Sequence, residues 1–175
     1  MSLQRISVAM PLTNREAKPA DFIPVFHDWI RRGAVEGLLI DVANYSHVHN
    51  GPGVLLIGHE GDYSIDTAEG HPALRYSMKR DQEGEPRELV ARAFRRLQGA
   101  AAESEKDSGR GVNANEITVR IYDRLAAPNS SAAFDELRPV IEGGIQDVLG
   151  ADTALSSSTT SDDPRAPLTV AVRIG

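Results

Sequence analysis

Apolar residues alternate with polar ones in several short segments of the chain, and they recur every three or four positions in three longer segments. Alternation is typical of a half-buried strand, and the longer period is typical of an amphipathic helix. The pattern predicts strands at residues 4–12, 38–48, 54–57, 73–79, 117–122 and 168–174. It predicts helices at residues 19–32, 86–101 and 130–148. This order indicates an α+β fold, with an antiparallel or mixed sheet covered mainly on one face by about three helices.

Residues 38–66 are the most hydrophobic stretch and also the one richest in side chains that could carry chemistry. Two apolar runs flank Asn50-Gly51-Pro52-Gly53, a sequence that favours a turn. We predict a β-hairpin with Val48 opposite Val54, and we place its strands in the centre of the sheet because both of their faces look apolar. Because side chains alternate along a strand, four polar residues would then share one face: Asp41, Tyr45, His47 and His59.

That shared face is the predicted ligand-binding site, and its chemistry has two functional interpretations. Imidazoles of His47, His49 and His59 could bind zinc or non-haem iron. Alternatively, a carboxylate beside His59 could orient the ring for acid–base catalysis. The structural alternative is a polar cluster that satisfies its own hydrogen bonds, or histidines that simply lie on the surface and in turns.

The three predicted helices differ in what they contribute to the core. Residues 19–32 carry Trp29, the only tryptophan of the chain, on an apolar stripe. Residues 86–101 carry an apolar stripe, while the arginines at 92, 95 and 96 are predicted to lie mostly away from it. In the third helix, Pro139 and Gly143-Gly144 predict a kink or a break.

Composition sets the class of protein rather than its activity. The chain has 175 residues, which predicts a single α+β domain over residues 1–175, with mobile polar loops near 103–115 and 156–166. The absence of cysteine excludes disulfides and thiolate chemistry. A net charge of -6 argues against a nucleic-acid partner. No apolar run suggests a signal peptide or a membrane span, so we expect a cytoplasmic protein.

The chain resembles an uncharacterised family of bacterial cytosolic proteins in three segments: FIPVFHDWI, LLIDVANYSHVHNGPGVLLIGHEGDYSID and YDRLAAPN. The resemblance covers most of the chain, and the second segment is long enough to be fairly specific. It implies a bacterial, single-domain protein of the cytosol. It transfers no catalytic residue, because that family has no established activity.

Taken together, these features favour a non-enzymatic binding or assembly protein that forms a homo-oligomer, with a dimer favoured. A small-molecule ligand is compatible with this interpretation. The alternative is a small-molecule or metal-dependent enzyme with its site at His47, His59 and Asp41. The sequence indicates no particular cofactor.

Overall fold

Eight strands of residues 2–175 join one antiparallel sheet, in the spatial order β2-β3-β4-β5-β1-β6-β8-β7. The computed structural model describes residues 2–175. The strands are, in chain order, β1 (Ile6–Pro11), β2 (Leu39–Tyr45), β3 (Gly53–Gly58), β4 (Gly61–Asp66), β5 (Ala73–Met78), β6 (Glu116–Ile121), β7 (Leu155–Thr159) and β8 (Leu168–Ile174). The predicted α+β class is confirmed, and every strand pairing is antiparallel.

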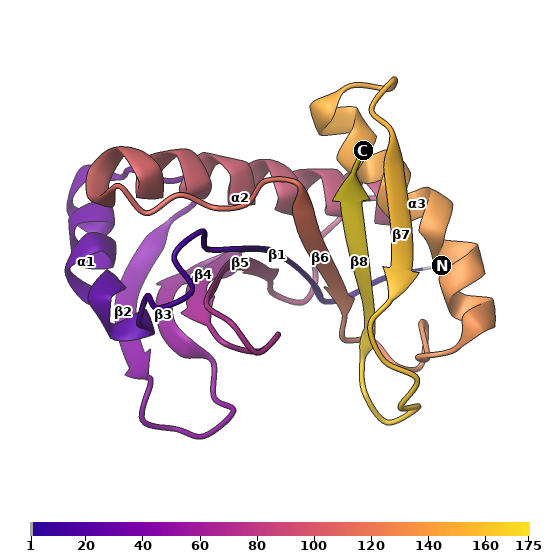
Figure 1. Ribbon diagram of the computed structural model, residues 1–175, viewed down its shortest axis with the longest axis horizontal. Coiled ribbons are helices and arrows are strands. Elements are labelled where there is room, and N and C mark those ends of the chain that lie inside the picture. Colours follow the sequence, from indigo (N-terminus) through magenta and orange to yellow (C-terminus); the bar gives the residue numbers. More distant parts are fainter. Residues whose placement is uncertain (1) are drawn as a thin grey trace.

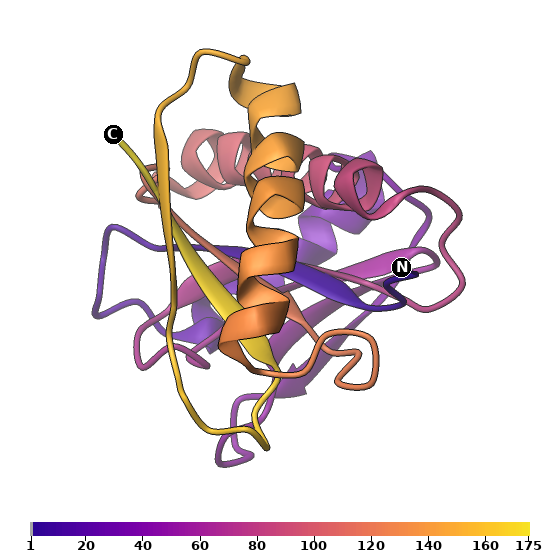
Figure 2. The ribbon, with the colours of Figure 1, turned by 90° about the vertical axis from the view of Figure 1, so that its right-hand side faces the viewer.

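Three α-helices cover one face of this sheet. They are α1 (Ile23–Arg32), which follows the short 3-10 turn η1 (Pro19–Phe22), α2 (Pro86–Ser108) and α3 (Ser131–Leu149). Figure 1 shows α2 crossing the middle of the sheet over β1 and β5, with α1 near β2. Figure 2 shows α3 running beside β7 and β8. We call the covered side the helix face and the other side the open face.

Alternation along the strands separates the two faces by chemistry. On β1, Ile6, Val8 and Met10 join the buried core under α2, and the residues between them turn to the open face. Every residue of β1 is buried, including Ser7. Burial on both faces is typical of a strand in the centre of a sheet, and β1 is the strand that joins the two halves of the order.

The predicted hairpin forms, but its register and its position differ from the prediction. Tyr45 lies opposite Gly53, and Ala43 lies opposite Leu55 rather than His59, a shift of four residues. Local turns absorb the residues after Tyr45, because the Val48 N–H donates to the Tyr45 carbonyl and the Gly51 N–H to the Val48 carbonyl. The strands are not both central: β3 is interior, while β2 is an edge strand of the sheet.

Two segments predicted to be polar loops are partly regular structure. The helix α2 continues to Ser108, so the connection that follows it is shorter than the predicted loop at 103–115. Ser104 is fully buried near the end of α2, where its hydroxyl donates to the Arg110 carbonyl. Residues 155–159 form β7, which pairs along β8 in spite of its serine-rich sequence. Backbone pairing thus orders polar residues whose side chains alone would not predict a strand.

The third helix has no break at its glycines. It is continuous from Ser131 to Leu149, through Pro139. The glycines serve helix packing instead: a Cβ atom at Gly144 would lie 2.8 Å from the Cβ of Val90 on α2. The predicted break is therefore wrong, and the absence of side chains here lets α2 and α3 approach closely. No helix within residues 2–175 has the length and apolar character that crossing a bilayer requires.

Trp29 is expected to be one of the largest single contributors to stability. It is fully buried, its ring centroid lies 5.3 Å from that of Phe26, and its indole N–H donates to the Asp107 carboxylate at 3.1 Å. Replacing Trp29 with alanine should lower the free energy of unfolding by about 3–5 kcal/mol. Urea denaturation followed by circular dichroism measures this. Trp29→Phe keeps most of the volume and should lose less; a loss below about 1 kcal/mol for the alanine variant would contradict a core role.

The contact between α2 and α3 can be tested at two glycines. Gly144→Ala should destabilise the protein by about 1–3 kcal/mol, because its methyl group collides with α2. Gly99 lies in α2 with no neighbouring atom within 4 Å of an added Cβ, so Gly99→Ala is the matched control. It should stabilise the protein by about 0.5–1 kcal/mol through helix propensity alone. Thermal unfolding of both variants decides the point, and equal effects would refute close helix contact.

Candidate functional site

The structure separates the residues of the predicted ligand site. Asp41 and Tyr45 lie on the same side of β2, as predicted, because a four-residue shift preserves the alternation of faces. His47 lies in the loop after β2, and His59 lies in the turn between β3 and β4. The six residues of β3 stand between these two positions, so the histidines are about 20 Å apart.

The histidines also lack the environment of a metal centre. His47, His49 and His59 are all exposed. Within residues 2–175, no group of three or more His, Asp or Glu side chains is placed to hold a metal ion. The metal prediction for these residues therefore gains no support from the geometry. Asp41 accepts a hydrogen bond from the Val42 N–H at 2.8 Å, which is a local backbone contact rather than an acid–base pair with His59.

A buried ion network occupies the open face at the centre of the sheet. Arg75 on β5 donates its Nε–H to Asp66 at 2.9 Å, and another N–H to Ser7 at 2.9 Å. Its remaining terminal nitrogen contacts both oxygens of Glu69 at 2.6 Å. Glu69 in turn accepts from Arg120 on β6 at 3.0 Å. Two arginines thus face two carboxylates, and the network has no net charge.

Electrostatics favour this arrangement although it is buried. Burial alone would lower the pKa of Arg75, but the adjacent carboxylates of Asp66 and Glu69 more than offset it, and the pKa is raised overall. The guanidinium therefore stays charged at every accessible pH. Because Glu69 belongs to the loop between β4 and β5, the network fastens that loop to the sheet. Each nitrogen of the Arg75 guanidinium already has a hydrogen-bond partner, so we interpret the network as structural.

A second buried arginine lies on the helix face. Arg96 of α2 donates to the Tyr76 hydroxyl at 3.0 Å and forms an ion pair with Glu60. Burial raises the pKa of Tyr76 and of Tyr63, whose rings are 4.9 Å apart. The Tyr63 hydroxyl donates to the Glu36 carbonyl at 2.8 Å. This cluster ties α2 and the loop before β2 to the sheet.

Arg96 was predicted to lie away from the core, and that prediction is wrong. The position of Arg96 in the sequence did indicate that it is buried. Arg96 follows Leu89 and Ala93 and precedes Ala100 at helical spacings of three and four residues, so it belongs to the buried stripe. Its charge alone suggested a solvent-exposed position, but the buried Tyr76 hydroxyl and the carboxylate of the exposed Glu60 are its partners.

The exposed apolar side chains point to a different feature, the edge strand β2. Five large hydrophobic residues are exposed within residues 2–175: Leu38 (68%), Ile40 (57%), Tyr45 (42%), Val48 (45%) and Leu125 (99%). Four of the five belong to residues 38–48, which we call the β2 edge. At the other side of the sheet, the edge strand β7 carries Ser156 and Ser158 as its exposed side chains. Apolar exposure is thus concentrated on one edge of the sheet.

Comparison with known proteins does not assign the chain to a family. No family model, curated protein or solved structure matches the chain. The resemblance to an uncharacterised bacterial family therefore stays a prediction.

The structural role of the ion network gives a stability prediction. Arg75→Met should cost about 3–5 kcal/mol, because Asp66 and Glu69 would remain buried without their main partner. Arg173 lies exposed on β8 of the same sheet and serves as the matched control. Arg173→Met should change stability by less than about 0.5 kcal/mol. Urea denaturation followed by tryptophan fluorescence measures both; a small loss for Arg75→Met would mean that the network is not structural.

Proposed function

We propose that the chain is a non-enzymatic assembly protein that forms a two-fold homodimer through its β2 edge. The observation that supports this most strongly is the concentration of exposed hydrophobic side chains at residues 38–48. An edge strand presents unpaired backbone N–H and C=O groups, and proteins normally protect it with charged side chains. Here one charged residue, Asp41, is accompanied by exposed apolar residues on the strand and on both sides of it.

The sequence of β2 fits a strand with two neighbours. Its apolar character on both faces is what predicted a central position, and within the monomer only β3 lies beside it. Pairing with a second β2 strand would make it interior. Such pairing would agree with the central position that the sequence predicted for this strand.

We favour a second copy of the chain over an unrelated strand as the partner of this edge, because two-fold symmetry preserves the antiparallel pairing of the sheet. A two-fold axis perpendicular to the sheet places the two β2 strands antiparallel, as every other pair in this fold is. It also keeps both helix faces on the same side. Each copy then presents the same surface to the other, which is the usual geometry of homodimers.

Charge restricts the register of such a pair. A β-bulge lies between Leu39 and Asp41, so the regular part of the edge runs from Asp41 to Tyr45. An axis at Asp41 would place two carboxylates directly opposite each other, which is unfavourable. An axis at Val42 instead places Asp41 opposite Ala43 of the second copy. We therefore favour pairing centred on Val42 or Ala43.

Introducing charge at this edge should break the dimer. We expect wild-type protein to sediment as a dimer, and Ile40→Lys together with Tyr45→Lys to weaken association at least tenfold, about 1.4 kcal/mol. Sedimentation velocity over a range of protein concentrations measures the equilibrium. Two controls each introduce one lysine elsewhere: Ser156→Lys on the opposite edge strand, and Leu125→Lys at the other strongly exposed hydrophobic residue.

The outcomes separate the alternatives clearly. Dimerisation lost in the double variant and retained in both controls supports the proposal. Wild-type protein that remains monomeric at high concentration overturns it. A dimer that persists in the double variant but dissociates in Ser156→Lys would place the interface on β7.

A further inference from the structure

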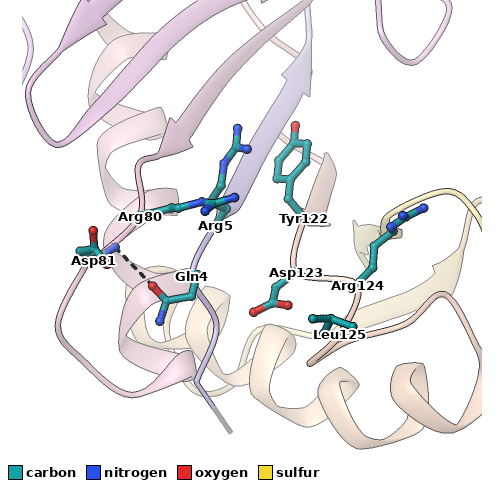
Figure 3. A pocket seen from close by; sticks show the side chains of 8 residues that line it. All are labelled: Gln4, Arg5, Arg80, Asp81, Tyr122, Asp123, Arg124 and Leu125. Carbon is teal, nitrogen blue, oxygen red and sulfur yellow. Dashed lines mark hydrogen bonds between the residues drawn. The ribbon is translucent and has the colours of Figure 1, made fainter.

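A cavity of about 490 Å³ lies at one end of the sheet, away from the β2 edge. Its position follows from topology. Because β1 is antiparallel to both β5 and β6, the residues before β1 lie beside those that follow β5 and β6. Each of these three chain segments contributes one arginine to the lining: Arg5, Arg80 and Arg124 (Figure 3). We call this space the three-arginine cavity.

The walls of the cavity are fastened to one another. The Tyr122 N–H donates to the Arg5 carbonyl at 3.0 Å, which continues the pairing of β1 with β6. The Arg5 guanidinium lies over the Tyr122 ring, 5.0 Å from its centroid. On the other side, the Asp81 N–H contacts the Gln4 side chain at 3.4 Å. The arginines are therefore presented from an ordered frame, which lowers the entropic cost of binding.

The arginines of this cavity are not paired with carboxylates of the described residues. Within residues 2–175, the guanidinium groups of Arg5 and Arg80 form no ion pair and no hydrogen bond, in contrast to the buried Arg75 and Arg96. Arg124 donates one N–H to the carbonyl of Arg165 and has further donors free. Figure 3 shows Arg5 and Arg80 on one side of Tyr122 and Arg124 on the other.

Two carboxylates line the same cavity and leave a net charge of about +1. Asp123 accepts a hydrogen bond from the Ala126 N–H at 3.2 Å, so it serves the turn after β6. Neither Asp81 nor Asp123 forms an ion pair with the cavity arginines in the described part of the chain. A local positive charge is notable in a protein whose net charge is -6.

We propose that the three-arginine cavity binds the phosphate ester of a small organic molecule. The guanidinium group is a planar fork that matches phosphate oxygens, and a phosphate offers acceptors to arginines from several directions at once. Tyr122 and the fully exposed Leu125 supply an apolar wall for the organic part. The volume lies within the usual range of small-molecule sites, roughly 300–1,000 Å³.

The site does not depend on assembly through the β2 edge. Its segments adjoin β5, β1 and β6, whereas β2 lies three strands beyond β5 in the sheet order. A dimer formed at β2 would leave the cavity open in both copies.

Nuclear magnetic resonance of the intact chain tests the proposal. Phenyl phosphate is titrated into 15N-labelled protein at constant ionic strength. We expect saturable shifts of backbone amides at residues 4–6, 80–82 and 122–125. Arg5→Gln with Arg80→Gln should weaken binding at least tenfold, and Arg80→Gln alone should weaken it less. Arg138, which is exposed on α3, gives the matched control, and Arg138→Gln should bind as the wild type does.

Two further ligands test the chemical class. Inorganic phosphate should bind more weakly than phenyl phosphate, because only the ester reaches Tyr122 and Leu125; equal affinity would overturn the ester assignment. Benzoate should also bind more weakly, and equal or tighter binding of benzoate would overturn the preference for phosphate. Shifts that never saturate, or that concentrate outside the three segments, would overturn the site itself.

Discussion

The fold depends on the pairing of β1 with β5 on one side and with β6 on the other. The sheet has a group of four strands, β2 to β5, and a group of three, β6 to β8, and β1 lies between the two groups and joins them. Both faces of β1 are buried, and α2 packs across it. The same pairing brings Ser7 to Arg75 and sets Arg5 beside Tyr122. The ion network of the open face and the three-arginine cavity at the end of the sheet thus both follow from where β1 is placed.

Two buried arginines reinforce this centre from opposite faces. Arg75 points to the open face and Tyr76, its neighbour on β5, points to the helix face and accepts from Arg96. Each arginine meets a carboxylate from a loop, Glu69 in one case and Glu60 in the other. A buried pair contributes little net stability by itself, but removing one partner is costly. The two ion pairs therefore fix the positions of these loops more than they stabilise the core.

The sequence pattern predicted the helices and the apolar strands, because an element that is buried on one face has apolar residues at regular intervals along the sequence. It missed β4 and β7, where Asp62, Ser64 and the serines of residues 156–158 are typical of loops. Backbone pairing with apolar neighbours orders such strands, and that information lies elsewhere in the chain. The predicted register of the hairpin was wrong for a different reason. The residues after Tyr45 form turns, so the first strand of the hairpin ends earlier than predicted. The residues of the predicted site lie apart for the same reason: His47 and His59 are in turns at opposite ends of β3, outside the strands that were predicted to carry them on one face.

The position of β2 shows that the sequence of one chain does not distinguish pairing within a molecule from pairing between molecules. The apolar residues on both faces of β2 predict a strand with a neighbouring strand on each side. They do not indicate whether the second neighbouring strand belongs to the same molecule. The two edges of the sheet differ in this respect, since β2 exposes Ile40 and Tyr45 while β7 exposes serines. Pairing two β2 edges about a two-fold axis uses both apolar edges and leaves only the polar β7 edges at the ends of the joined sheet. Such an assembly closes at two copies, because neither remaining edge offers the apolar contacts that a third copy would need.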